Sequence, residues 1–148
     1  VADAFFQIAN SRSNFISRGD NSGTHEREKF IWHLASIKPT LDRGKWYQEV
    51  GAGMGAALNM ASATNSYTLT DRGTWLSFRN YERLEILFEG DPNLLNFYGV
   101  ILVNPQRYQH IRAKSGQIFI DWLVSDEGQK AIDNYKIGGK QLFFSNAD

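Results

Sequence analysis

The segment Ser17-Arg18-Gly19-Asp20-Asn21-Ser22-Gly23-Thr24-His25 decides the fold, because it joins a short strand to a helix. The segment Asn14-Phe15-Ile16-Ser17 is typical of a short strand, and the loop that follows is rich in turn-forming residues. From about Thr24, apolar residues recur at helical spacing until Pro39 stops the helix. This strand-loop-helix pattern recurs along the chain, which predicts an α/β fold.

The same reading predicts the remaining elements. A helical stripe covers residues 1–9, a helix follows the glycines at 51–55, a helix turn runs through 75–78, and the last third from Pro105 is helical. Further strands are expected at residues 46–50, 67–70, 84–88 and 98–103. The helical last third presents Ile118, Trp122 and Leu123 on one face. Ser125-Asp126-Glu127 is a helix-start signal, and Gly138-Gly139 is expected to end that helix.

Length and composition limit the function classes. The chain has 148 residues, enough for one domain and part of a second. Lys and Arg total 16, as do Asp and Glu, so no basic face supports a nucleic-acid partner. There is no Cys and no apolar run long enough to span a membrane. The chain begins at Val1 without a signal-like segment, so we expect processing or trimming.

The first loop has the parts that an oxyanion site requires. A helix start presents free N–H groups, glycines let the backbone approach a ligand, hydroxyls add donors, and Arg18 supplies a planar fork for two oxygens. The alternative is an ordinary helix cap, in which Ser22 or Thr24 binds the first-turn amides and Arg18 is solvated.

A second loop, Thr68-Leu69-Thr70-Asp71-Arg72-Gly73-Thr74, repeats this chemistry. Its alternative is a tight turn with an Asp cap. Because parallel strands send their carboxyl-end loops to one edge of the sheet, the two loops together favour a shared ligand site. We therefore predict that Arg18 and Arg72 lie on the same edge of one sheet, within reach of a common ligand.

The other motifs are weaker evidence of function. Gly51-Ala52-Gly53-Met54-Gly55-Ala56 loosely fits a dinucleotide pattern, but a close helix-to-strand turn or added amides for the anion site explain it better. His25 and His33 lie eight positions apart with no third ligand, so no zinc site is expected. No convincing nucleophile, acid or base set is visible, and we predict that the protein is not an enzyme and holds no cofactor.

The motifs resemble those of a known family, the periplasmic tungstate-binding proteins of ABC importers. The resemblance rests on the two loops, on Glu26 and Glu28, and on Trp46-Tyr47, Gly51-x-Gly53-Met54-Gly55 and Gly138-Gly139-Lys140-Gln141-Leu142-Phe143. It runs in consistent order from about residue 1 to residue 144.

The resemblance implies a type II periplasmic-binding-protein fold, with one lobe plus the C-terminal return segment present and the first lobe largely missing. Residues 1–96 would be the second lobe, and 97–148 the return strand and C-terminal helices that belong to the first. The family's Thr- and Ser-rich first-lobe loop has no counterpart here, so the missing lobe is an expected partner. The ligand-binding residues implied are Ser17, Arg18, Ser22, Gly23, Thr24, His25, Thr70, Asp71, Arg72, Gly73 and Thr74.

The function expected is capture of tungstate or molybdate outside the cytoplasm for the membrane subunits of an ABC importer, with metal present only as the oxyanion. The alternatives are a phosphate-binding protein and the effector-binding domain of an anion-responsive regulator. Phosphate binders often add a carboxylate that accepts the phosphate proton. The side-chain directions of Asp20 and Asp71 therefore discriminate between the ligands.

Overall fold

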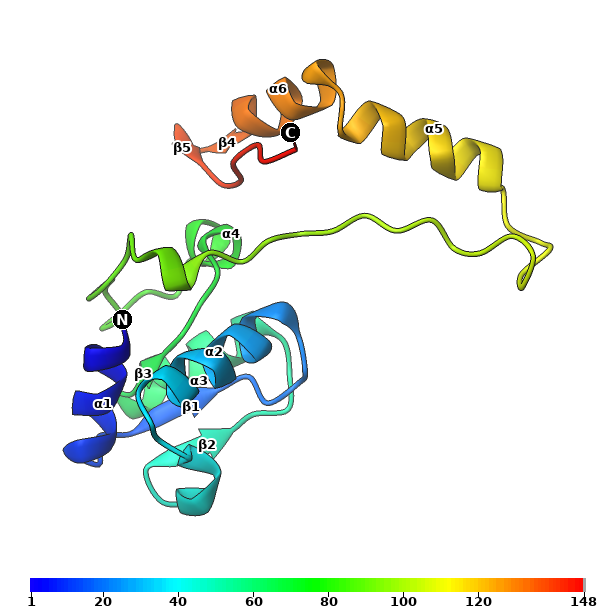
Figure 1. Ribbon diagram of the computed structural model, residues 1–148. Helices are drawn as coiled ribbons and strands as arrows, with labels where there is room; N and C mark the ends of the chain where they lie inside the picture. The colour runs from blue at the N-terminus through cyan, green and yellow to red at the C-terminus, as the bar shows by residue number, and fades with distance from the viewer. Residues whose placement is uncertain (148) are drawn as a thin grey trace. The chain divides into compact units, whose positions relative to one another are not determined.

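The computed structural model describes residues 1–147 and divides the chain into two compact units, Val1–Asn96 and Phe97–Asp148. The first unit contains α1 (Ala2–Asn10), β1 (Phe15–Ser17), α2 (Gly23–Leu34), η1 (Pro39–Asp42), β2 (Tyr47–Glu49), α3 (Met54–Thr64), β3 (Tyr67–Thr68), α4 (Arg72–Ser77) and η2 (Pro92–Leu94). The second contains α5 (Ala113–Leu123), α6 (Asp126–Asn134), β4 (Lys136–Ile137) and β5 (Lys140–Gln141) (Figure 1).

A three-stranded parallel sheet organises the first unit, in the order β2-β1-β3. In its register Phe15 pairs with both Tyr47 and Tyr67. Each strand is followed by a loop and then by a helix, so that α2, α3 and α4 all begin beyond the carboxyl ends of the strands. The predicted α/β class with a parallel sheet is thus confirmed.

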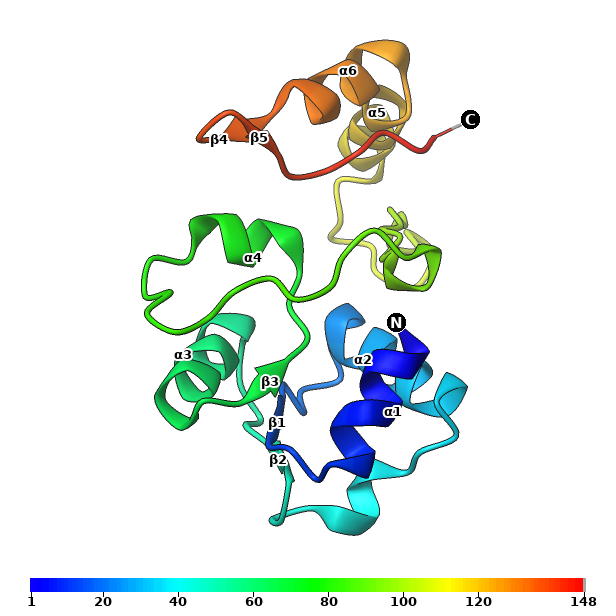
Figure 2. The same cartoon turned by 90° about the vertical axis from the view of Figure 1, so that its left-hand side faces the viewer.

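The sheet has one apolar core on each face, because successive residues of β1 point to opposite sides. Phe15 packs with residues of α1 and α2, and Ile16 packs with residues of α3. Figure 2 shows α1 and α2 on one side of the sheet and α3 on the other. The first core is mostly aromatic, and the second is built on small residues of α3 that let helix and sheet approach closely. The buried members are Phe5, Phe15, Ile31, Trp32, Trp46 and Tyr47 on one face, and Ile16, Met54, Ala57, Leu58 and Ala61 on the other.

Several predicted boundaries were wrong. Helix α2 ends at Leu34, well before Pro39, and β3 stops at Thr68. The strands predicted at 84–88 and 98–103 are absent from the described residues. Both segments have strand-like composition, but an extended segment becomes a strand only when a neighbour pairs with its backbone. Neither segment has such a neighbour in residues 1–147.

The second unit confirms one predicted signal and corrects another. Ser125 caps α6, and its hydroxyl oxygen accepts a hydrogen bond from the Gly128 amide at 3.3 Å. Helix α6 ends at Asn134, however, and the two glycines instead form the turn between β4 and β5. Gly138 and Gly139 both have positive φ, +56° and +77°, as a two-residue hairpin turn requires.

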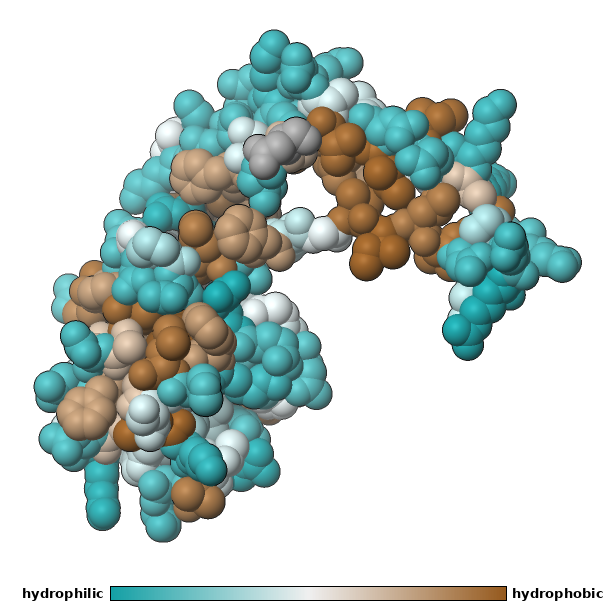
Figure 3. Space-filling view, viewed as in Figure 1, coloured by the Kyte–Doolittle hydropathy of each residue, from teal (hydrophilic) through white to brown (hydrophobic). Residues whose placement is uncertain are grey.

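Large apolar side chains stay exposed in the second unit. Pale-to-brown atoms gather along α5 and the extended segment before it (Figure 3). On α5, Ile118 is 60% exposed, Phe119 55% and Trp122 39%. Within residues 1–147, every helix is too short or too polar to cross a bilayer.

Candidate functional site

The first loop is organised around Asp20. One oxygen, Oδ2, accepts from Arg18 Nε at 3.1 Å and forms an ion pair with Arg18 Nη2, while Oδ1 accepts from the Ser22 amide at 3.2 Å. Burial alone would raise the pKa of Asp20, but the hydrogen bonds from Ser22 and Arg18 outweigh it and lower the pKa to about 2. Asp20 therefore stays ionised and fixes the Arg18 guanidinium beside the start of α2.

Helix α2 begins at Gly23, one residue before the predicted start near Thr24, with Ser22 as its cap. The Ser22 hydroxyl oxygen accepts from the His25 amide at 3.3 Å. In the part of the chain that the structure describes, nothing accepts a hydrogen bond from the Gly23 and Thr24 amides. His25 Nδ1 accepts from the Asn21 amide at 3.0 Å, so in the neutral ring Nε2 carries the proton. This helix start thus offers free backbone and imidazole donors.

The structure places Ser17 apart from these donors. Ser17 is fully buried on the α2 side of β1, so a ligand cannot reach its hydroxyl in this conformation. Its neighbour is Glu28, a 2% exposed carboxyl that the resemblance included without a role. Glu28 Oε1 accepts from Trp32 Nε1 at 3.1 Å and from the Tyr47 hydroxyl at 2.9 Å. The only sequence signal for this cluster was an acidic residue on the apolar stripe of a helix.

The second loop confirms the alternative of an Asp cap. Asp71 Oδ2 accepts from the Thr74 amide and Oδ1 from the Thr74 hydroxyl, both at 2.8 Å. Thr70 donates its hydroxyl to the Asp71 carbonyl at 3.3 Å, and Arg72 Nη2 donates to Glu89 at 2.9 Å. Within residues 1–147, the Arg72 and Gly73 amides have no acceptor. The loop therefore caps α4 and still presents free N–H groups.

The parallel pairing of β1 with β3 sends both loops to the same edge of the sheet, as predicted for the loops that carry Arg18 and Arg72. That both side chains reach a common ligand stays a prediction. That edge combines two guanidinium groups, hydroxyls and four free amides. These are donors for an anion with several oxygens. Both loop carboxylates are already engaged by protein donors, so the edge offers little to a ligand that must itself donate a proton.

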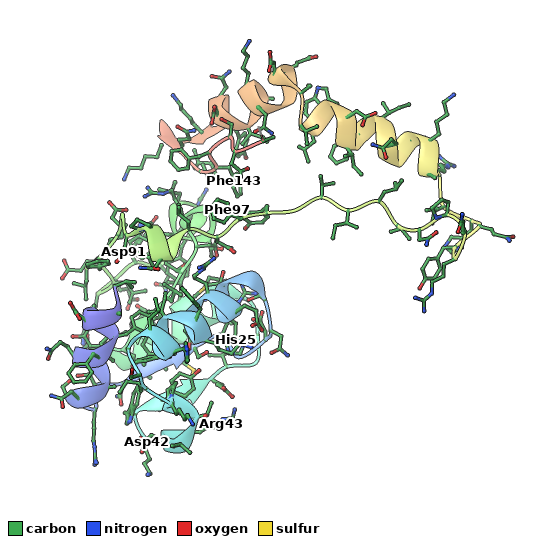
Figure 4. The ribbon with its side chains drawn as sticks, in the orientation of Figure 1. His25, Asp42, Arg43, Asp91, Phe97 and Phe143 are labelled. Atoms are coloured by element: carbon green, nitrogen blue, oxygen red, sulfur yellow. The ribbon has the colours of Figure 1, made fainter. Side chains whose placement is uncertain are left out.

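A pocket in the first unit adjoins the first loop. It has a volume of about 390 Å³ and lies along α2, η1 and β2, where Asn21, His25, Arg43 and Glu49 are among its lining residues. Figure 4 shows His25 on α2 and Arg43 beyond η1. Arg43 pairs with Glu49 at 2.5 Å, which offsets its charge. Among residues 1–147, no group of three His, Asp or Glu side chains is arranged to hold a metal ion.

The chain is similar in sequence to a known protein family and to proteins named for anion binding. Residues 1–127 match the PBP superfamily domain. A Haloferax volcanii protein with a provisional name as an ABC transporter anion-binding protein is 44% identical, over 99% of this chain and 44% of its own length. The tungstate-binding protein TupA of Peptoclostridium acidaminophilum is 40% identical, over 99% of this chain and 51% of its own.

A solved structure of the tungstate ABC transporter from Geobacter sulfurreducens has a TM-score of 0.80 and 41% identity. The similarity covers 90% of this chain and 56% of that one. The chain thus spans about half the length of these three proteins, and the resemblance drawn from its motifs is confirmed.

Proposed function

Because this chain belongs to the PBP superfamily, we propose that it forms the ligand-gripping part of an extracytoplasmic solute-binding protein. Its ligand is a tetrahedral oxyanion, tungstate first and molybdate second, which it delivers to the membrane subunits of an ABC importer. It performs no catalysis. The relatives' names, which describe anion binding and tungstate binding for ABC transport, support this assignment.

One observation supports tungstate or molybdate over phosphate as the ligand. The carboxylates in both loops accept hydrogen bonds from the protein itself. Asp20 is bound by Arg18 and Ser22, and Asp71 by Thr74. Hydrogenphosphate keeps a proton at neutral pH and binds well where a free acceptor receives it, whereas tungstate and molybdate are fully deprotonated. An edge rich in donors with its acceptors occupied favours the deprotonated ions over phosphate.

The ligand contacts we propose come from both loops. Arg18, Ser22, Gly23, Thr24 and His25 would act from the first loop, and Thr70, Arg72, Gly73 and Thr74 from the second. Ser17 would hold the first loop in place as a buried residue directly before it, and Asp71 would hold the second loop as the cap of α4. The donors then surround the anion from two adjacent strands, which fixes its position without a counter-cation.

We further propose that residues 1–96 are one lobe of a two-lobed protein, and that residues 97–148 pack on a first lobe that is not part of this sequence. The half-length match to the relatives supports this assignment, as do the exposed apolar residues of α5. In the natural full-length protein, Phe119 and Trp122 should be protected from hydroxyl-radical labelling compared with the chain of residues 1–148. Equal labelling in both forms would contradict the two-lobe proposal.

Calorimetric titration of the natural full-length protein with tungstate, molybdate and phosphate tests the function. We expect saturable binding of tungstate and molybdate, with phosphate much weaker. Strong phosphate binding without a response to tungstate would instead support the phosphate alternative.

A further inference from the structure

Glu28 has a position that the proposed contacts do not explain. Its side chain is 2% exposed in the aromatic core between α2 and the sheet. A buried carboxyl group is costly unless it is hydrogen-bonded, and an apolar residue of similar size would fill the same space at lower cost. A carboxyl group in this core therefore calls for a role that an apolar side chain could not perform.

The hydrogen bonds of Glu28 show what that role requires. The bond from Trp32 Nε1 lies within α2, one turn further along the helix. The bond from the Tyr47 hydroxyl comes from the first residue of β2, so it connects the helix to the sheet. Thr24 lies one turn before Glu28 on the same face of α2. A shift of the helix start relative to the strands would therefore break the bond between Glu28 and Tyr47.

The neighbourhood of Glu28 also includes an unpaired group. The Ser17 hydroxyl is completely buried close to this carboxyl, yet it forms no hydrogen bond of normal geometry within residues 1–147. Ser17 is the last residue of β1, directly before Arg18. The cluster of Ser17, Glu28, Trp32 and Tyr47 thus joins the strand that leads into the first loop with the helix that leaves it.

We propose that Glu28 is a positioning residue of the oxyanion site, which holds the free amides at the start of α2 against the ends of β1 and β2. This inference rests on the proposed oxyanion function and assigns Glu28 no contact with the ligand. The amides of Gly23 and Thr24 are effective donors only if they stay in place when the anion binds. The buried hydrogen bond between Glu28 and Tyr47, one helical turn further along α2, supplies that rigidity.

The charge state of Glu28 gives the proposal a separate readout. Burial raises the pKa of Glu28 to about 7, although hydrogen bonds from neighbouring groups partly oppose the rise. The titratable groups that face it are Tyr47 and Glu49 from β2, while α1 faces the cluster with Phe5. A dianion bound at the start of α2 would raise the pKa of Glu28 further, so binding should take up protons and weaken as pH rises through neutrality.

The experiment compares tungstate binding by the natural full-length wild type with three variants, between about pH 6 and 8.5. Glu28→Gln keeps an oxygen that accepts from Tyr47 and Trp32, and should retain wild-type affinity near pH 6 while losing the proton uptake. Tyr47→Phe removes only the bond between helix and sheet, and should weaken binding about tenfold. Glu26→Gln is the matched control, because Glu26 is an exposed acid of the same helix that pairs with Lys29.

The proposal fails if Tyr47→Phe binds tungstate with wild-type affinity, or if Glu28→Gln keeps the wild-type proton uptake. A purely structural role would lower the melting temperature of Tyr47→Phe and leave its tungstate affinity unchanged. Absence of tungstate binding in the wild type would instead overturn the proposed function, so the two failures are distinguishable. Proton uptake is obtained by calorimetry in buffers of different ionisation enthalpy, which also corrects the apparent heats.

Discussion

Replacement of Arg18 by Lys tests the oxyanion site most directly, because the substitution keeps the positive charge but removes the planar guanidinium group, which can bind two oxygens at once. In the structure the Nε and one Nη2 N–H of Arg18 are directed at Asp20, which leaves three of its five N–H groups for a ligand. A lysine ammonium placed at a single point cannot hold Asp20 and two ligand oxygens in the same geometry. At least one charge-assisted hydrogen bond to the anion should be lost.

The size of the loss follows from that bond. A hydrogen bond to a charged group is worth about 1.5–3 kcal/mol, and about 1.4 kcal/mol corresponds to a tenfold change in affinity. Arg18→Lys should therefore weaken tungstate binding about tenfold to a hundredfold. Arg18→Ala should lose at least as much, but it also leaves the Asp20 carboxylate with fewer donors and should cost about 1 kcal/mol of stability. The Lys variant is thus the cleaner measurement.

Calorimetric titration of the natural full-length protein with tungstate measures the effect, and thermal unfolding without ligand measures stability. Arg43→Lys is the matched control, because Arg43 also pairs with a carboxylate but its side chain is 61% exposed and lies outside the proposed contacts. We expect the control to bind like the wild type. Wild-type tungstate affinity in both Arg18 variants would remove Arg18 from the site and refute the reasoning.

Three further predictions concern the supports of the site. The pKa of Glu28 is raised from 4.5 to about 7, so its contribution to stability is present at low pH and lost as pH rises through 7. In urea unfolding above pH 7, the free energy of unfolding of Glu28→Gln should therefore exceed that of the wild type by up to about 3 kcal/mol. Below about pH 4.5 the two proteins should be equally stable. Gly19→Ala should lower the free energy of unfolding by about 2 kcal/mol or more in the same assay, because φ is +63° and the new Cβ would lie 2.7 Å from Glu49 Cβ. Gly51 has a similar φ of +66° but open space around it, so Gly51→Ala should cost only the backbone strain of about 1 kcal/mol. Asp71→Ala should cost about 1 kcal/mol of stability and weaken tungstate binding, whereas Asp71→Asn, which can still cap α4, should restore most of both.

The sequence was informative where local chemistry decides the structure. Ser22 and Asp71 are cap residues with glycines beside them, and the helices begin where these residues predict. The shared edge followed from a topological rule, since consecutive strand-loop-helix units form parallel sheets whose loops emerge on one side. These features depend on residues that are neighbours in sequence.

Features that depend on distant partners could not be predicted. Segment 84–88 has the composition of a strand, but pairing depends on whether another backbone lies beside it. The hydrogen bond of the Glu28 cluster between Glu28 and Tyr47 joins residues 19 positions apart, and only the register of β1 with β2 places Tyr47 beneath α2. The engagement of Asp20 by Arg18 is local, yet its direction toward the protein, which bears on the choice of ligand, required the structure.

The charges of the two loops argue that hydrogen-bond geometry, more than net charge, must supply the affinity. Two guanidinium groups, Arg18 and Arg72, are paired with two carboxylates, Asp20 and Glu89, and Asp71 adds a third negative charge. The side chains of this edge are therefore not net positive, and a dianion gains little from their summed field. What remains is a set of backbone amides at helix starts and the free N–H groups of the fixed guanidinium groups, whose strength depends on direction and exclusion of water. A site of this kind discriminates between anions by shape and protonation, and it loses affinity when a residue that positions its donors is changed, even one that never touches the ligand.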